Sequence, residues 1–327
     1  MKPILSAETE AWPIRGAFTL SRGSKTEAIV VVCRIARDGC TGLGECVPYA
    51  RYGESVQSVM AQIEAVTPLI EQGGGRNKLL HAMAPGAARN AVDCALWDLE
   101  AKLTGIPVQS LVCAAPPRPL PTCYTISLDD PDEMARQAHA NAFRPLLKVK
   151  LGGEQDEDII HAVRSAAPDA GIILDANEGW TQDTVHDLMA VAAQAGVALI
   201  EQPLPAGQDE ILERIPRPVP VCADESVHVA ADLERLRERY DAINIKLDKT
   251  GGLTEALTMR DRAREIGYSV MIGCMVATSL SMAPAVLLAQ EAQYVDLDGP
   301  LLLTRDRPHG LHYSDTAVSP PERELWG

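Results

Sequence analysis

Short runs of aliphatic residues recur through the second half of the chain, and each run ends in charged residues. The runs are LLKVK, GIILDAN, VALIEQP, VPVCADE and AINIK. Buried parallel strands read as continuous aliphatic stretches, and one strand with its crossover connection takes roughly 25 residues. The pattern therefore predicts consecutive βα units of the kind that build a (β/α)8 barrel.

The beginning of the chain has a different order of elements. In EAIVVVCRIARDGCTGLGEC, two β-rich stretches meet at Asp38-Gly39, a dipeptide typical of a hairpin turn. Apolar residues at helical spacing follow in SVQSVMAQIEAVTPLI and in AARNAVDCALWDLEAKLTG, and Gly105 with Pro107 predicts the end of the second helix. Strands followed by helices indicate an α+β unit.

A proline-rich segment, AAPPRPLP at residues 114–121, is the best candidate for a domain boundary. Beyond it, PTCYTISL, SVMIGCM and QYVDLD predict strands, and DPDEMARQAHANAF, DLERLRERYD and LTEALTMRDRAREIG predict helices. We therefore expect one domain over residues 1–116 and a second over 117–299. The tail 300–327 shows no periodicity, and we expect it to pack back on the first domain.

Composition narrows the function classes. A hydrophobic content of 46% and a charged content of 23% describe an ordinary globular protein, and the net charge of -15 argues against nucleic acid or an anionic membrane as a partner. The eight cysteines are scattered without a C-x-x-C, which favours free thiols over zinc or disulfides. The first residues lack a signal-peptide core and no run of 18 apolar residues occurs, so we expect a cytoplasmic protein.

Five charged residues close successive aliphatic runs at spacings of 25, 26, 23 and 22: Lys150, Asp175, Glu201, Asp224 and Lys246. In a ring of eight strands, Lys150 would end the second strand and Lys246 the sixth, directly across the barrel. A substrate held between them would meet one lysine on each face. Removal of a carbon-bound proton on one face and its return on the other inverts the centre, which favours a racemase or epimerase.

Lys148 lies two positions before Lys150, so both side chains point to the same side of the strand. We expect the two ammonium groups to lower one another's pKa, which would make one a base near neutral pH. The alternative is a solvated pair at an exposed strand end.

Three acids on neighbouring strands would repel one another unless a cation compensates them. Ligation by oxygen alone, from Asp175, Glu201 and Asp224, favours Mg²⁺. Asn177 and Glu225 are candidates to support these ligands. The alternative is three separate acids, each bonded to local amides or lysines.

The motifs KVKLGG, LDANEGW, IEQPLP, CADES and NIKLDKTGG, with GECVPYARYGES and PGAARNAVDCALWDLEAK, together resemble the enolase superfamily in its muconate-lactonizing-enzyme subgroup. Within it, the chain is most similar to the dipeptide epimerases acting on L-Ala-D/L-Glu. The resemblance covers nearly the whole chain. It implies a modified (β/α)7β barrel under an N-terminal α+β capping domain that the tail 300–327 completes.

The resemblance also implies residue roles. Lys150 and Lys246 would be the acid–base pair, Lys148 would support Lys150, and the three acids would bind Mg²⁺. The implied reaction is a two-base 1,1-proton transfer through an enediolate, which inverts the C-terminal residue of a dipeptide in murein peptide recycling.

Two further motifs bear on the substrate. Asp296-Leu297-Asp298 resembles the feature that binds the free ammonium group of a dipeptide, although a plain acidic strand end or helix cap would read the same way. Arg22 and Lys25 lie where the family has a specificity loop, and either could meet a glutamate side chain or simply face solvent.

Other readings stay open at this stage. The subgroup includes o-succinylbenzoate synthase, a lyase that would not use the Asp-x-Asp motif, and N-acylamino acid racemases. A ligand-binding barrel without catalysis is a third reading. The sequence leaves the oligomeric state open, a homo-oligomer included.

Overall fold

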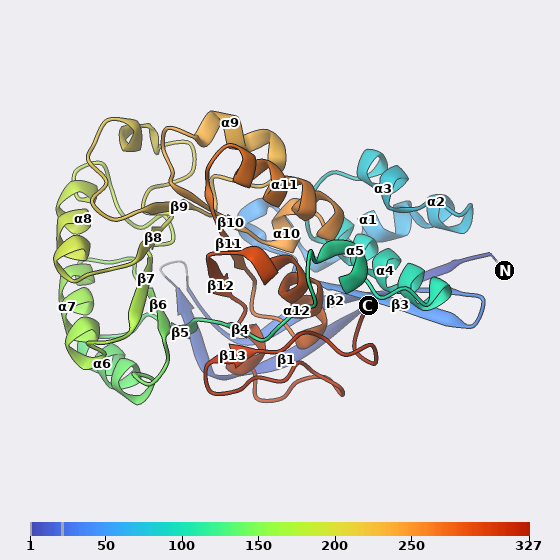
Figure 1. Cartoon of the computed structure of the whole chain (residues 1–327), viewed down its shortest axis with the longest axis horizontal. Helices are drawn as coiled ribbons and strands as arrows, with labels where there is room; N and C mark the ends of the chain where they lie inside the picture. Colours follow the sequence, from blue (N-terminus) through green and yellow to red (C-terminus); the bar gives the residue numbers. More distant parts are fainter. Residues whose placement is uncertain (1, 21–22) are drawn as a thin grey trace.

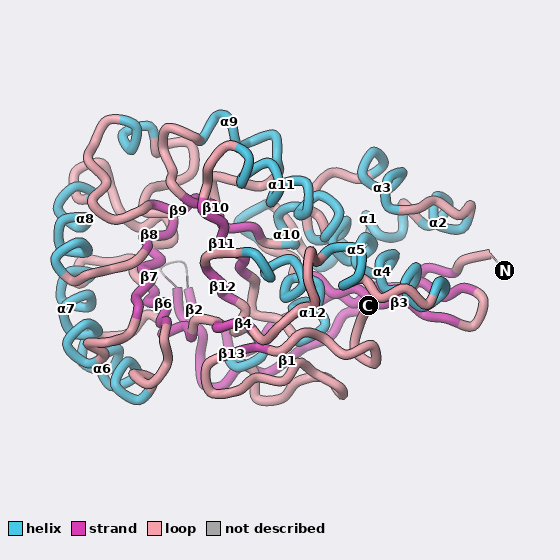
Figure 2. Tube along the Cα trace, viewed as in Figure 1, coloured by secondary structure: helices cyan, strands magenta, loops and turns pink. Residues whose placement is uncertain are grey.

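The computed structural model describes residues 2–20 and 23–327. It joins an antiparallel sheet with helices to a parallel barrel (Figures 1 and 2). The expected α/β fold, a modified (β/α)7β barrel with an N-terminal α+β capping domain, is therefore confirmed. In the described part of the chain, no helix combines the length and the apolar character that a bilayer crossing requires.

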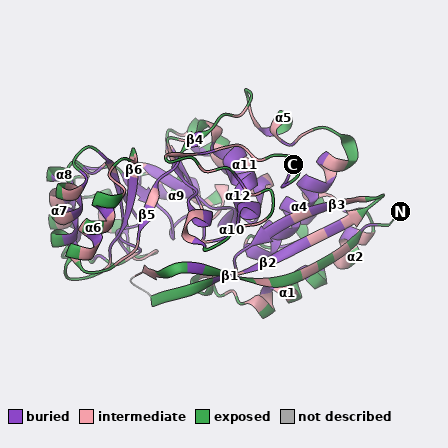
Figure 3. Ribbon diagram, turned by 90° about the horizontal axis from the view of Figure 1, so that it is seen from below, coloured by how far each residue is buried: buried purple, intermediate pink, exposed green. Residues whose placement is uncertain are grey.

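The capping sheet is built from β1 (Ile4–Leu20), β2 (Gly23–Arg37) and β3 (Cys40–Cys46) in that order. The predicted hairpin is confirmed, because Asp38 (φ 49) and Gly39 (φ 82) both adopt the positive φ of a type I′ turn. Strand β1 was not predicted. In Figure 3 the β1–β2 hairpin runs beneath the barrel, and residues 23–27 at the start of β2 are exposed.

Helix α4 (Ala87–Thr104) packs directly on β3. A side chain at Gly42 or Gly44 would lie 2.1 Å from a carbonyl oxygen of α4, so only glycine permits this close approach. The predicted helix end at Gly105 is confirmed by its left-handed φ of 74. The remaining elements are η1 (Ala50–Tyr52), α1 (Val56–Ala65), α2 (Thr67–Glu71), α3 (Arg76–Ala82) and α5 (Gln109–Val112).

Eight parallel strands form the barrel, and strands that follow one another in the chain are neighbours in the sheet. They are β5 (Tyr124–Ile126), β6 (Leu146–Lys150), β7 (Gly171–Asp175), β8 (Leu199–Glu201), β9 (Val221–Ala223), β10 (Ala242–Ile245), β11 (Ser269–Gly273) and β12 (Tyr294–Asp296). The first and last strands meet where Cys123 N donates to Val295 O at 2.9 Å, so the barrel nearly closes.

The crossover connections differ in length. Full helices are α6 (Pro131–Ala140), α7 (Asp156–Ala166), α8 (Val185–Gln194), α11 (Leu253–Glu265) and α12 (Ser279–Leu288). Short turns are η2 (Glu210–Glu213), η3 (Ala230–Asp232), α9 (Leu233–Leu236), α10 (Leu247–Thr250), η4 (Ala289–Glu291) and η5 (Gly299–Leu302). The predicted helix DLERLRERYD was too long, because the α-helix ends at Leu236 and turns carry the chain to Tyr240.

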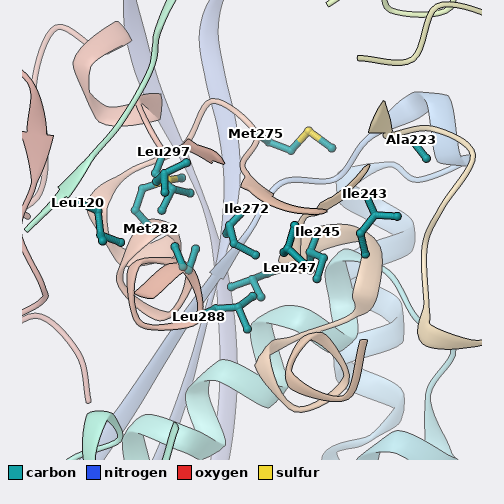
Figure 4. Packing of buried hydrophobic residues seen from close by; sticks show 14 of the residues in the cluster. Leu120, Ala223, Ile243, Ile245, Leu247, Ile272, Met275, Met282, Leu288 and Leu297 are labelled. Atoms are coloured by element: carbon teal, nitrogen blue, oxygen red, sulfur yellow. The ribbon is translucent and has the colours of Figure 1, made fainter. Parts of the chain in front are cut away.

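The barrel strands present alternate side chains to two environments. One set joins the large core beneath the helices, where Ile243, Ile245 and Ile272 lie in the same cluster as Leu288 (Figure 4). The other set forms a small separate group, which we call the interior cluster: Ile173, Leu199, Cys222, Ala242 and Met271.

The tail after residue 300 contacts the capping domain as expected. Trp326 Nε1 donates to Leu43 O at 3.0 Å, and Gly327 N donates to Asp98 Oδ1 at 2.8 Å. Strand β13 (Ala317–Val318) pairs with β4 (Leu120–Pro121). The division into residues 1–116, 117–299 and 300–327 stays our proposal, supported by a second hydrophobic core that contains only residues between Val31 and Leu99.

Candidate active site

The predicted lysines and acids of the barrel lie at the carboxyl ends of its strands and point to its interior. The residues two positions before the three acids belong to the interior cluster: Ile173, Leu199 and Cys222. Because side chains repeat every second residue, the acids continue the same row toward the barrel mouth. Strand register places Lys150, Asp175 and Glu201 side by side.

Lys148 is the cation around which three carboxylates converge. Its Nζ lies 2.9 Å from Asp175, 2.7 Å from Glu201 and 2.7 Å from Asp296, and its side chain is only 2% exposed. Lys150 Nζ donates to Asp175 Oδ2 at 2.5 Å. Both lysines are buried, so the reading as a solvated pair is wrong.

Lys246 occupies the opposite side of the barrel and pairs with the third acid. Its Nζ donates to Asp224 Oδ2 at 2.6 Å. Lys249 donates to the other oxygen, Asp224 Oδ1, at 2.5 Å, and to Asn244 O at 2.9 Å. In this structure each of the three acids therefore has a lysine partner.

The expected lowering of the lysine pKa is wrong for Lys148. Burial acts to lower the pKa of Lys148, but the carboxylates of Asp175, Asp296 and Glu201 outweigh burial and hold it well above its usual value. The pKa of Lys246 is raised in the same way, mainly by Asp224. The neighbouring carboxylates, rather than the neighbouring ammonium group, therefore decide the direction of the pKa shift.

The lysines compensate the negative charges of Asp175 and Glu201 to different extents. Burial opposes ionisation of Asp175, yet Lys148 and Lys150 lower its pKa. Burial and the nearby Asp175 charge instead raise the pKa of Glu201 to about 7. The ammonium groups therefore leave part of the negative charge at this end of the barrel uncompensated.

The residues present fit a hard divalent cation. Across residues 2–20 and 23–327, no three His, Cys, Asp or Glu side chains converge as a ready-made metal cluster, because the oxygens turn toward lysines. The donors are nevertheless all carboxylate oxygens, the ligand type that Mg²⁺ prefers. Glu201 Oε2 is buried without a properly oriented hydrogen bond from any described residue, although Lys148 Nζ lies 2.7 Å away. This oxygen is available to a cation.

Asp296 and Asp298 both lie buried at the end of β12. Asp296 pairs with Lys148 and accepts from Cys123 Sγ at 2.9 Å, while Asp298 Oδ2 accepts from Thr125 N at 2.6 Å. Burial and the Asp296 charge raise the pKa of Asp298 to about 6. The pair is thus brought together with a surplus of negative charge.

The supporting residues are also placed near the acids. Asn177 and Glu225 are both buried, and Asn177 N donates to Asp175 Oδ1 at 3.1 Å. Asn177 has a positive φ of 45, a conformation that is uncommon outside turns and is favoured at functional sites.

The end of strand β1 lies next to the barrel mouth. Lys150 Nζ lies 5.9 Å from the ring centre of Phe18, and Leu128 N donates to Thr19 O at 3.2 Å. Lys25 is exposed, with Nζ 5.4 Å from the ring centre of Tyr49. Arg22 lies outside the described residues.

Two residues of the site, Asn244 and Lys249, were not predicted from the sequence. Asn244 donates from Nδ2 to Glu201 Oε1 at 2.8 Å, and Lys249 holds Asp224 as described. Asn244 could have been found, because it precedes Lys246 by two positions and must share its side of β10. Gly273 makes room for it, since a Cβ there would lie 2.5 Å from Asn244 Oδ1.

A cavity of about 360 Å³ lies between the capping domain and the barrel, next to this site. Its lining includes Tyr52, His228, Asp248 and Lys249, and none of the predicted site residues. The rings of Tyr52 and His228 meet edge to face with centres 4.6 Å apart. Lys249 therefore separates this cavity from Asp224.

Two family models match the chain. The mandelate racemase / muconate lactonizing enzyme N-terminal domain matches residues 5–113, and the enolase C-terminal domain-like model matches residues 132–324. The L-Ala-D/L-Glu epimerase of Escherichia coli (strain K12) is 45% identical over 93% of this chain and 96% of its own length. The N-acetyl-D-glutamate racemase of a Pseudoalteromonas species is 43% identical over 91% of this chain and 95% of its own length.

Solved structures agree with these matches. An enolase family member from Agrobacterium tumefaciens with homology to dipeptide epimerases, with bound sodium, L-Ala-L-Glu and an ordered loop, superposes with a TM-score of 0.98. It is 56% identical, and the match covers 99% of this chain and 100% of that one. Further solved relatives, 26% to 30% identical, are described as dipeptide epimerases complexed with Mg and a dipeptide.

Proposed function

Because the chain belongs to the enolase superfamily and is an isomerase, we propose that it inverts the α-carbon of the C-terminal residue in dipeptides such as L-Ala-L/D-Glu. The proposed context is the recycling of murein peptides in the cytoplasm. The choice of dipeptide draws on the 45% identical protein from Escherichia coli, which is named an L-Ala-D/L-Glu epimerase.

One observation carries the proposal, which is the position of the two lysines. Lys150 follows the second barrel strand and Lys246 the sixth, so three strands separate β6 from β10 in either direction around the ring. Both side chains are buried and lie at the same end of the barrel. A substrate between them exposes one face of its α-carbon to each lysine.

The reaction that suits this geometry has two proton transfers. One lysine, as the neutral amine, takes the α-proton, and the electron pair of the broken C–H bond moves into the substrate carboxylate as an enediolate. The opposite lysine, as the ammonium, donates a proton to the other face of the same carbon. Starting from the other epimer exchanges the roles of Lys150 and Lys246.

Asp175, Glu201 and Asp224 would hold Mg²⁺, and Lys148, Asn177 and Glu225 would support the site. When bound, the cation supplies positive charge to the carboxylate on which negative charge develops as the α-proton leaves. The uncompensated charge at Glu201 and the all-oxygen donor set support this assignment.

Asp296 and Asp298 are the proposed binding site for the free ammonium group of a dipeptide. Asp298 lies beside Asp296, and burial together with the Asp296 charge raises its pKa to about 6, so a cation bound there would favour its ionised form. A substrate ammonium would supply that charge. Lys25 and Arg22 remain proposals for contact with the side chain of the inverted residue.

A second candidate is the racemisation of N-acylated glutamate, which the 43% identical racemase favours. Such a substrate has no free ammonium group, so it would offer the two aspartates no cation to bind. That difference separates the two candidates.

A substrate screen in D2O tests the proposal. L-Ala-L-Glu, L-Ala-D-Glu and N-acetyl-glutamate are incubated with enzyme and Mg²⁺, and exchange of the α-proton is followed by NMR. We expect faster exchange and inversion for the dipeptides. Turnover of N-acetyl-glutamate alone would assign the second function instead.

A further inference from the structure

A buried chain of polar side chains lies behind the ends of β8 and β9, away from the lysines. It runs from Arg239 at the surface through Asp209, then Ser226 and Tyr240, to Gln202. Ser226 Oγ and Tyr240 OH each donate to Asp209 Oδ2 at 2.6 Å, and Arg239 donates to Asp209 Oδ1 at 2.7 Å. We call these five residues the Gln202 network.

The network ends on the strand that carries Asp224. Gln202 Oε1 accepts from Asp224 N at 2.8 Å and from Ser226 N at 3.1 Å. Its Nε2 lies 2.9 Å from Ser226 Oγ and 3.0 Å from Tyr240 OH. The side chain of Gln202 therefore bridges from β8 to the backbone immediately after β9.

Gln202 also follows Glu201 directly, and its backbone is strained. Its φ of 36 lies in the left-handed region, which is unfavourable for a non-glycine residue and persists only where surrounding contacts fix it. The contacts that fix it are those of the network. Its backbone NH also donates to Cys222 O at 2.9 Å, so both its backbone and its side chain bind the β9 segment.

The network carries a full negative charge at its centre. Burial acts against ionisation of Asp209, but the hydrogen bonds from Ser226, Tyr240 and Arg239 outweigh burial and lower its pKa. Charge-assisted bonds of this kind are short and strong, and a fully satisfied buried network gives its members one fixed arrangement. Lys150 bonds to Asp175 and Lys246 to Asp224, and within residues 2–20 and 23–327 neither lysine forms a hydrogen bond or ion pair with a member of the network.

We infer that Asp209, Ser226 and Tyr240 are positioning residues that act through Gln202 to fix the separation of the Glu201 and Asp224 carboxylates. The inference rests on the proposed function, in which these two acids hold a divalent cation. Groups that hold metal ligands by hydrogen bonds usually contribute 10- to 100-fold to metal affinity, and the network holds Asp224 by its backbone N through Gln202. Loss of the Tyr240 hydroxyl should therefore weaken cation binding although Tyr240 touches neither carboxylate.

The test compares Tyr240→Phe with a matched control, Tyr268→Phe. Tyr268 is also buried and its hydroxyl donates to Leu233 O at 2.9 Å, but it lies outside the network. Mn²⁺ affinity is measured by electron paramagnetic resonance, alongside the unfolding temperature, for both variants and the unmodified protein. We expect at least 10-fold weaker Mn²⁺ binding for Tyr240→Phe and an unchanged affinity for Tyr268→Phe.

Unchanged affinity in Tyr240→Phe, or equal weakening in both variants, would overturn the inference. If Tyr240→Phe does not fold, Ser226→Ala removes a hydroxyl of the same network and carries the same expectation. Failure of the unmodified protein to bind Mn²⁺ would instead contradict the proposed function, so the two failures are distinguishable.

Discussion

Lys246 Nζ lies 2.6 Å from Asp224 Oδ2, so one proposed acid–base group is bound to one proposed metal ligand. Lys249 binds the other oxygen of the same carboxylate at 2.5 Å. Two ammonium groups thus share one buried acid. A change at Asp224 is expected to affect proton transfer and cation binding together, and experiments must measure the two separately.

Cation dependence is the first prediction. We expect chelation to abolish turnover and Mg²⁺ to restore it, because no other described group neutralises the charge that develops on the substrate. Mg²⁺ at 100 times its Kd should also stabilise the fold by about 2.7 kcal/mol, visible as a raised unfolding temperature. An equal ionic strength of NaCl and the variant Asp224→Asn are the controls. Full turnover after chelation would contradict the prediction.

The second prediction separates the two lysines. Lys246→Ala should abolish epimerisation, while Lys150 still exchanges the α-proton of one epimer in D2O. Lys150→Ala should show the complementary exchange with the other epimer, since each lysine faces one side of the carbon. NMR of each pure epimer measures the exchange. A one-base mechanism gives a different result, in which one variant loses exchange of both epimers and the other keeps both.

The sequence predicted most of the barrel because five successive strands, β6 to β10, are aliphatic runs with a charged residue at or just after the end. It also predicted the hairpin at Asp38-Gly39, where local turn chemistry decides the structure. Strand β1 was missed because its register with β2 is irregular between Pro13 and Phe18, which breaks the alternating pattern of a plain hairpin strand. Where the β1 register breaks, the chain bonds to the distant tail instead, because the Pro13 carbonyl oxygen accepts from Thr304 N at 2.9 Å.

From the sequence we predicted which residues form the site, but not the direction of their pKa shifts. Spacing along the chain gave the lysines and acids, but the sign of a pKa shift depends on distances between strands that spacing does not supply. Lys148 illustrates this, because three carboxylates within 2.9 Å outweigh both its burial and the neighbouring lysine. The role of Gln202 was not predicted for the same reason, since its partners Asp224 and Tyr240 lie in the segments just after β9 and just before β10.

The third prediction concerns substrate choice. Asp298→Asn removes a charge but keeps an oxygen that can accept from Thr125 N. We expect kcat/KM for L-Ala-L-Glu to fall about 10- to 100-fold, since hydrogen bonds to charged groups are worth about 1.5–3 kcal/mol. Any turnover of N-acetyl-glutamate should change less, because that substrate has no ammonium group. Equal losses for both substrates would remove Asp298 from ammonium recognition.

The last prediction concerns pH and the contact between the two domains. Asp248 is buried on α10, where its Oδ1 accepts from Asn90 Nδ2 at 2.8 Å and from Val47 N at 3.1 Å. Burial, aided by the charges of Glu54 and Glu45, raises its pKa from 3.8 to about 7. Between these values the folded protein binds more protons than the unfolded chain, so stability falls as pH rises.

From pH 5 to pH 7 this single group should lower the free energy of unfolding by about 2 kcal/mol. Asp248→Asn keeps the acceptor oxygen but does not ionise, so its stability relative to the unmodified protein should improve over that range. Urea unfolding at pH 5, 6, 7 and 8 measures the difference, with Asp315→Asn, an exposed site, as the matched change of charge. Parallel pH profiles for the unmodified protein and Asp248→Asn would show that this carboxyl does not titrate on folding, and the loss of stability would then belong to other buried acids.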